Sequence, residues 1–124
     1  MTVILIVEDN EKNMKLARDV LQAKGYQTLE AINGEDGVRL ALEHIPDMVL
    51  MDIQLPDING IEAFRRIRAN PATSGVPVVA FTASVTPMDR SRITDAGFDS
   101  FIGKPINLRE FLETVRKVIE GKAP

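Results

Sequence analysis

Three short apolar runs constrain the fold of this chain more than any other feature of its sequence. They occupy residues 3–7, 47–51 and 77–81 and consist almost entirely of aliphatic, methionine and phenylalanine side chains. A run that is apolar at nearly every position is typical of a strand buried on both faces of a parallel sheet. Parallel strands need long crossover connections, so helices should lie between these runs.

The segments between the runs have helical periodicity and end at Gly or Pro residues. Helices are predicted at residues 10–24, 34–44, 58–70 and 86–97, and from residue 107 toward the C-terminus. Thr86 and Pro87 have the pattern of an N-cap followed by a first-turn proline. Two weaker strands are predicted at residues 27–32 and 100–102.

Five strands in strict alternation with five helices predict an α/β fold with one parallel sheet covered by helices on both faces. The three strongly apolar runs should be central strands, and the two weaker runs should be edges. With right-handed crossovers, these constraints favour the strand order 2-1-3-4-5. This is the flavodoxin-like, doubly wound (βα)5 arrangement.

Length, charge and composition exclude several classes of function. The 124 residues predict a single domain over residues 1–124, without an output domain. The absence of Cys excludes disulfides, thiolate metal sites and thiol catalysis. The net charge of −3 gives no attraction to nucleic acid or to an anionic membrane, and neither partner is expected. Without a basic segment at Met1 or a membrane-length apolar run, we expect a cytoplasmic protein.

Polar side chains follow four of the predicted strands, where parallel α/β sheets bind their ligands. Glu8 and Asp9 follow the first strand and Asp52 follows the third. Thr82 follows the fourth strand and Lys104 the fifth. The three carboxylates should converge between adjacent strands, where they would repel one another without a cation. All-oxygen ligands favour a hard cation, so the pattern indicates Mg²⁺.

The stretches around these positions resemble the receiver domain of two-component response regulators. The matching stretches, in family order along the whole chain, are Ile6-Val7-Glu8-Asp9-Asn10, Leu50-Met51-Asp52-Ile53-Gln54-Leu55-Pro56, Asn59-Gly60, Phe81-Thr82-Ala83 and Lys104-Pro105. Within the family, the chain looks most like the single-domain cell-cycle regulators. The fit rests on the segments around Glu8, Asp52 and Lys104, and on Asn13-Met14-Lys15-Leu16.

The resemblance implies that Asp52 accepts a phosphoryl group from a phosphohistidine, supplied by a histidine kinase or a histidine phosphotransfer protein. It implies a Mg²⁺ site made by Asp9, Asp52 and the backbone carbonyl of Gln54, with Glu8 contributing directly or through water. Many family members have Asp where this chain has Glu8. The chain would then be a phosphoacceptor that signals by protein binding, and it would not turn over external substrates.

The resemblance also implies roles for residues on the fourth and fifth strands. Lys104 would pair with Asp52 and then with the phosphoryl oxygens, and Thr82 would donate a hydrogen bond to the phosphoryl group. Thr82 and Phe101 occupy the positions of the family's conformational switch. The bond before Pro105 is a candidate cis peptide.

Two interaction surfaces are expected from the resemblance and from helical spacing. Met14 and Leu16 lie at opposite edges of the buried stripe of the first helix, so at least one should be exposed. With Pro105 and Ile106 they would dock a phosphotransfer partner. The face of helix 4, strand 5 and helix 5 would bind a downstream protein, and the chain would be a monomer or a phosphorylation-promoted dimer.

Three other functions are compatible with an α/β fold. A phosphatase with an Asp nucleophile typically has a second Asp two residues later, where this chain has Gln54. A flavodoxin-like binder of a phosphorylated cofactor needs a Gly/Ser/Thr-rich first loop, whereas residues 8–11 are acidic. An unphosphorylated adaptor would not need all five receiver positions to be filled.

Overall fold

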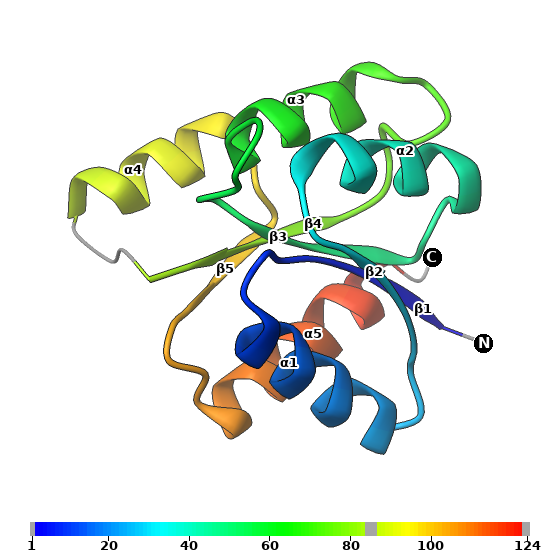
Figure 1. The fold of residues 1–124 in the computed structure, drawn as a ribbon, viewed down its shortest axis with the longest axis vertical. Coiled ribbons are helices and arrows are strands. Elements are labelled where there is room, and N and C mark those ends of the chain that lie inside the picture. Colours follow the sequence, from blue (N-terminus) through cyan, green and yellow to red (C-terminus); the bar gives the residue numbers. More distant parts are fainter. Residues whose placement is uncertain (1, 84–86, 123–124) are drawn as a thin grey trace.

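The computed structural model describes residues 2–83 and 87–122, which form a five-stranded sheet between two layers of helices (Figure 1). In chain order the elements are β1 (Val3–Val7), α1 (Glu11–Ala23), β2 (Gln27–Ala31), α2 (Gly34–His44), β3 (Met48–Asp52), α3 (Gly60–Ala69), β4 (Val78–Thr82), α4 (Pro87–Ala96), β5 (Ser100–Gly103) and α5 (Leu108–Lys122). The strand order is β2-β1-β3-β4-β5 and every neighbouring pair is parallel. The predicted fold class and strand order are therefore confirmed.

The two inner strands at the centre of the sheet end one residue later than predicted. Asp52 pairs with Phe81, so it is the last residue of β3, and Thr82 is likewise the last residue of β4. Asp47 directly precedes β3, and its side chain accepts a hydrogen bond from the Val3 N–H at 2.8 Å. The backbones of Asp52 and Thr82 are thus held in place by the sheet itself.

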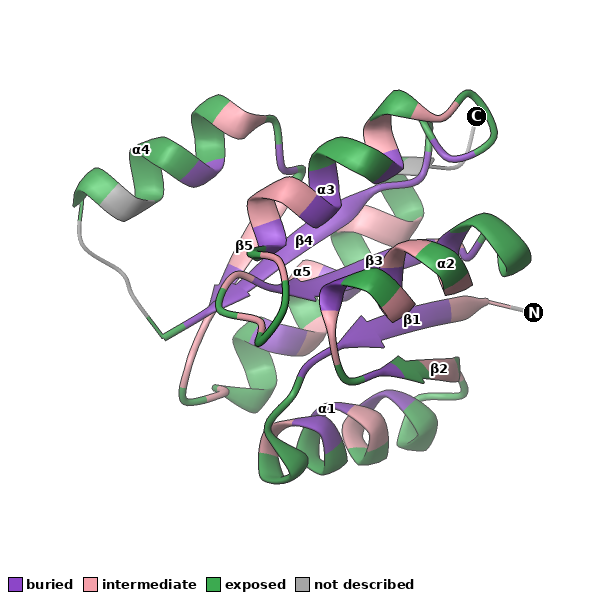
Figure 2. Cartoon of the chain, turned by 45° about the horizontal axis from the view of Figure 1, so that its top comes forward, coloured by how far each residue is buried: buried purple, intermediate pink, exposed green. Residues whose placement is uncertain are grey.

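Both faces of the three central strands β1, β3 and β4 are buried, which explains the continuously apolar runs (Figure 2). Leu5 and Val7 point into the core under α2, α3 and α4, whereas Ile4 and Ile6 point into the core against α1 and α5. Burying a large aliphatic side chain contributes about 1.5–3 kcal/mol. The central strands therefore form a rigid base for the residues at their ends.

Asparagine side chains cap the N-termini of four helices by accepting a backbone N–H, and these residues are Asn10, Asn33, Asn59 and Asn107. Gly25 and Gly97 end α1 and α4 with φ angles of 89° and 102°, in the left-handed region that favours glycine. The predicted N-cap Thr86 lies outside the described residues.

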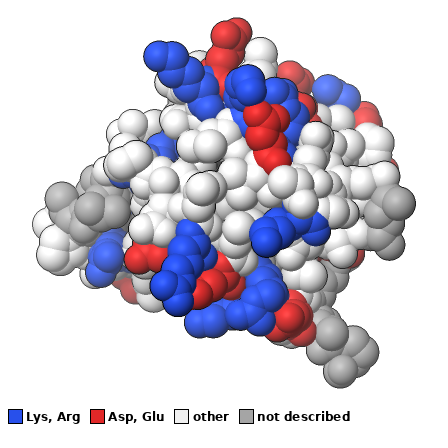
Figure 3. Space-filling view, turned by 90° about the horizontal axis from the view of Figure 1, so that it is seen from below, with Lys and Arg blue, Asp and Glu red and all other residues white. Residues whose placement is uncertain are grey.

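The surface formed by α1 and α5 carries charged side chains of both signs (Figure 3). Lys15 pairs with Asp19 at 2.8 Å and Arg18 pairs with Glu30 at 3.2 Å. Over residues 2–83 and 87–122, no helix has both the length and the apolar character needed to cross a membrane.

Candidate functional site

A cavity of about 420 Å³ opens at the carboxyl ends of β1, β3 and β5. Its lining comes from strand ends, from the loops that follow them and from the first turn of α1, namely Glu8, Asp9, Asn10, Asn13, Asp52, Gln54, Leu55, Pro56, Ala83 and Lys104. Segments far apart in the sequence meet here because parallel strands deliver their ends to one edge. We refer to this space as the acidic cavity.

Three carboxylates lie together in the acidic cavity. Glu8, Asp9 and Asp52 each offer an oxygen within 4.8 Å of the others. Glu8 is fully buried and Asp52 is 3% exposed, whereas Asp9 faces solvent. The Glu8 backbone continues the pairing of β1 with β2 by one residue, because its N–H donates to the Ala31 carbonyl at 3.0 Å. This pairing keeps Glu8 at the buried end of the strand. The cluster thus has a buried floor and an open side.

Lys104 is the cation that faces these carboxylates. Its Nζ lies 2.7 Å from Glu8 Oε1 and 3.2 Å from Asp52 Oδ2, and the side chain is only 13% exposed. The ammonium also lies 4.6 Å from the centroid of the Phe81 ring. The Lys104 N–H donates to the Thr82 carbonyl at 2.9 Å, and the bond to Pro105 is cis. Pairing with the end of β4 therefore fixes the backbone position of Lys104.

Three carboxylates against one ammonium leave the acidic cavity with excess negative charge. Burial raises the pKa of Glu8, and the neighbouring Asp52 raises it further, although contacts with Lys104 and the Asn10 N–H oppose this shift. Glu8 Oε1 is buried and, among the described residues, touches Lys104 without hydrogen-bond geometry. This oxygen-only, electron-rich donor set fits a hard divalent cation such as Mg²⁺.

The loop after β3 contacts the Asp52 carboxylate oxygen that is not paired with Lys104. The Gln54 N–H donates to Asp52 Oδ1 at 3.0 Å. At the far end of the loop, the Gly60 N–H donates to the Ile53 carbonyl at 2.8 Å. A Cβ on Gly60 would overlap the Asp52 carbonyl oxygen, so only glycine allows this approach. Each Asp52 oxygen thus has its own partner.

Neither of the two predicted switch residues is among the residues that line the acidic cavity. Thr82 is 4% exposed and lines a second cavity of about 380 Å³ between the loop after β3 and α4. Phe101 is half-buried, and the Arg90 guanidinium from α4 lies 4.9 Å from its ring centroid. The Arg90 contact was not predicted, because it joins two elements whose relative position the sequence does not reveal.

The predicted docking residues differ in exposure. Leu16 is 42% exposed and Pro105 is exposed, whereas Ile106 is half-buried. Met14 is only 5% exposed and packs in the core between the sheet, α1 and α5. The expectation that Met14 helps to form the docking surface is therefore corrected: its side chain supports α1 from within, and Leu16 is the exposed member of the pair.

One residue near the site has contacts that were not predicted from the sequence. Asp57, in the loop after β3, accepts hydrogen bonds from the Gly34 and Glu35 N–H groups at 2.8 Å each. Desolvation opposes ionisation of this carboxyl, but hydrogen bonds from backbone N–H groups lower its pKa to about 2. Its place directly after Pro56 gave no sign that it would reach the start of α2.

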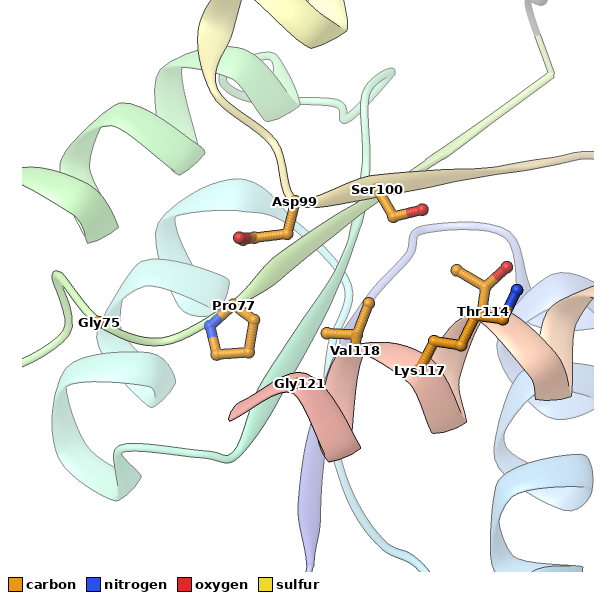
Figure 4. A pocket seen from close by; sticks show the side chains of 8 residues that line it. All are labelled: Gly75, Pro77, Asp99, Ser100, Thr114, Lys117, Val118 and Gly121. Carbon is orange, nitrogen blue, oxygen red and sulfur yellow. The ribbon is translucent and has the colours of Figure 1, made fainter. Parts of the chain in front are cut away.

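A separate cavity of about 590 Å³ lies at the amino ends of β4 and β5, beside α5 (Figure 4). Asp99, the one carboxylate among the described residues that line it, accepts a hydrogen bond from the Val78 N–H at 2.8 Å and pairs with Arg68 at 2.7 Å. The Asp99 contacts join the amino ends of β4 and β5, and the cavity lies at the opposite edge of the sheet from the acidic cavity.

Comparisons with known proteins agree on one family. The profile described as the response regulator receiver domain matches residues 4–116. The polar-differentiation response regulators DivK of Brucella anthropi and Brucella ovis are 42% and 41% identical over 116 residues, covering 94% of each chain. The predicted likeness to single-domain cell-cycle regulators is therefore confirmed.

Solved structures share the fold closely. The receiver domain of a sensor histidine kinase from Pseudomonas aeruginosa PAO1 superposes with a TM-score of 0.89 at 33% identity, covering 96% of this chain and 98% of that one. That crystal structure contains a magnesium ion coordinated in its active site cleft. A CheY-like receiver domain protein from Methanospirillum hungatei JF-1 gives a TM-score of 0.88 at 25% identity, covering 98% and 96%.

Proposed function

The chain belongs to the family of response regulator receiver domains, and on this basis we propose that Asp52 accepts a phosphoryl group from a phosphohistidine. The donor is a histidine kinase or a histidine phosphotransfer protein. One observation carries the proposal: the Asp52 carboxylate lies at the floor of an open cavity, between two further carboxylates and the Lys104 ammonium. A carboxylate in that setting can act as a nucleophile.

The transfer is an exchange of one bond to phosphorus. An oxygen of Asp52 attacks the phosphorus as the nitrogen–phosphorus bond breaks, and the imidazole leaves with the electron pair of that bond. Lys104, now shared between Glu8 and Asp52, is placed to follow the charge onto the phosphoryl oxygens. Thr82 would donate its hydroxyl to the same group from the end of β4.

The metal site of this proposal uses the oxygens of the acidic cavity. Asp9 and Asp52, with the backbone carbonyl of Gln54, would hold Mg²⁺, and Glu8 would contribute directly or through water. The ion supplies charge neutralisation for the phosphoryl oxygens. Lys104 already engages the buried Glu8, which leaves the exposed Asp9 as the most accessible ligand.

We propose that the output is a change in protein binding and that residues 1–124 act as a single receiver without turnover of external substrates. The exposed side of α4, β5 and α5 is the candidate target surface. A cavity of about 380 Å³ opens there, with Arg90, Phe101 and Lys117 among its lining residues. Phosphorylation adds roughly −1.5 to −2 charges near Thr82, and its effect would reach this surface through Phe101.

The partner that delivers the phosphoryl group would dock beside the open side of the acidic cavity. Leu16 offers an exposed apolar side chain on α1, and Pro105 and Ile106 follow Lys104 on the neighbouring loop. An apolar helix face of the partner could contact both segments while its phosphohistidine reaches Asp52.

Intact-mass spectrometry with a small-molecule phosphodonor tests the proposal. With Mg²⁺, the protein should gain the mass of one phosphoryl group, and chelation of the metal should abolish the gain. Asp52→Ala should gain nothing, whereas Asp47→Ala, which changes a carboxylate at the opposite edge of the sheet, should still react. An equal gain in Asp52→Ala would refute the assignment.

A further inference from the structure

The carboxylate of Asp57 joins the loop after β3 to the first turn of α2. Its Oδ1 accepts the Gly34 N–H and its Oδ2 accepts the Glu35 N–H, each at 2.8 Å. The first backbone N–H groups of a helix lack partners within the helix and carry the positive end of its dipole. Asp57 thus meets both groups as an anion held by two charge-assisted hydrogen bonds.

A packing contact strengthens the same junction, and an ion pair between α2 and α3 lies beside it. A Cβ on Gly34 would overlap Cγ1 of Ile58, so the loop packs directly on the helix backbone. Beside it, Glu35 pairs with Arg66 of α3 at 2.9 Å. Figures 1 and 2 show the loop lying against the start of α2 in both views. The junction is therefore closely packed as well as hydrogen-bonded.

This loop is also the one that carries the acceptor site. It follows Asp52 directly, and its second residue, Gln54, donates its N–H to Asp52 and lines the acidic cavity. It ends at Gly60, whose approach to the Asp52 carbonyl leaves no room for a Cβ. Between these two ends, Asp57 is the point where a side chain of the loop is tied to α2.

We propose that Asp57 is a positioning residue for the acceptor site: by clamping the loop to α2, it holds the Gln54 backbone at the acidic cavity in the arrangement that binds Mg²⁺. The inference rests on the proposed function, because it assigns Gln54 to the metal site. Residues that orient metal ligands typically change affinity about 10–100-fold when they are replaced.

A matched pair of variants separates positioning from helix capping. Asp57→Ala and Asn33→Ala each remove one side-chain cap from the first turn of α2, because Asn33 Oδ1 accepts the Asp36 N–H at 2.8 Å. Only Asp57 belongs to the loop that carries Gln54. Calorimetric titration of the metal-free proteins with Mg²⁺ should give a Kd about tenfold higher for Asp57→Ala. This is the lower end of the affinity change expected for a residue that orients a metal ligand. Asn33→Ala should keep the Kd of the parent.

Backbone NMR of the metal-free protein adds a readout that does not depend on the ion. The amide signal of Gln54 should shift or broaden in Asp57→Ala and stay in place in Asn33→Ala. Asp57→Asn keeps one acceptor oxygen and should give an intermediate Kd, which also provides the test if Asp57→Ala does not fold.

Each outcome distinguishes this inference from the function on which it rests. Equal Mg²⁺ affinities for Asp57→Ala and Asn33→Ala would overturn the positioning role alone, provided that the parent protein binds Mg²⁺ and is phosphorylated. A parent protein that neither binds Mg²⁺ nor gains a phosphoryl group would overturn both. A selective loss in Asp57→Ala, with a displaced Gln54 amide, supports the proposal.

Discussion

Replacing Lys104 with Met should destabilise the metal-free protein strongly. The substitution keeps most of the aliphatic chain but removes the ammonium that faces Glu8 and Asp52. Two buried carboxylates would then remain with oxygens within 4.8 Å of each other and no cation between them. The variant therefore isolates the electrostatic role of Lys104 in the fold.

The distances set the size of this effect. At an effective dielectric constant of about 20, charges 2.7 and 3.2 Å apart attract by about 6 and 5 kcal/mol respectively. Desolvation offsets much of this gain, and breaking a buried pair by removing one partner costs about 3–5 kcal/mol. For a domain of this size, that loss lowers Tm by roughly 10–20 °C.

Differential scanning calorimetry at neutral pH in a chelator measures the change. Lys15→Met is the matched control, because Lys15 lies 2.8 Å from Asp19 but both side chains are exposed. Exposed ion pairs contribute little, so the control should melt close to the parent protein. Saturating Mg²⁺ should narrow the gap for Lys104→Met by supplying a cation. A decrease in Tm no larger than that of Lys15→Met would refute the reasoning.

Further predictions concern Asp57, the two apolar residues of α1 and Phe101. The pKa of Asp57 falls from 3.8 to about 2 on folding, so its stabilisation is present above pH 3.8 and is lost toward pH 2. The Tm deficit of Asp57→Asn should accordingly disappear over that interval in thermal melts. Met14→Ala should cost about 2–5 kcal/mol in denaturant unfolding because Met14 is buried. Leu16→Ala should unfold almost like the parent but slow phosphotransfer from a phosphohistidine protein, with no change toward a small phosphodonor. Phe101→Ala should weaken phosphorylation-dependent target binding in pull-down titrations more than it slows phosphorylation; equal binding would remove Phe101 from the switch.

The fold was predictable because its signals are local. Continuous apolar runs identify strands buried on both faces, and Asn10 and Gly25 bracket α1 as expected. The one-residue error at β3 arose because an Asp at either end of an apolar run gives the same sequence pattern. Asp52 continues the ladder opposite Phe81, whereas the Asp47 side chain bonds to the backbone of β1.

The acidic cavity was predictable for a different reason: parallel strands deliver their carboxyl ends to one edge, so Glu8, Asp52 and Lys104 had to meet there. The contacts that were not predicted depend on the path of a loop and on the rotation of a helix about its axis. Asp57 reaches back to Gly34, and Arg90 reaches forward to Phe101. No periodicity or spacing in the sequence encodes either distance.

Reductive trapping of the phosphorylated protein tests the central claim most directly. Borohydride converts an aspartyl phosphate to homoserine, and peptide mass spectrometry then identifies the residue that carried the phosphoryl group. After reaction with a phosphohistidine protein and Mg²⁺, homoserine should appear at position 52 and at no other acidic residue of the acidic cavity. A phosphoryl group on Glu8 would instead yield 2-amino-5-hydroxypentanoic acid, and one on Asp9 would yield homoserine at position 9. Either product, or phosphorylation without a reducible acyl phosphate at Asp52, would contradict the account.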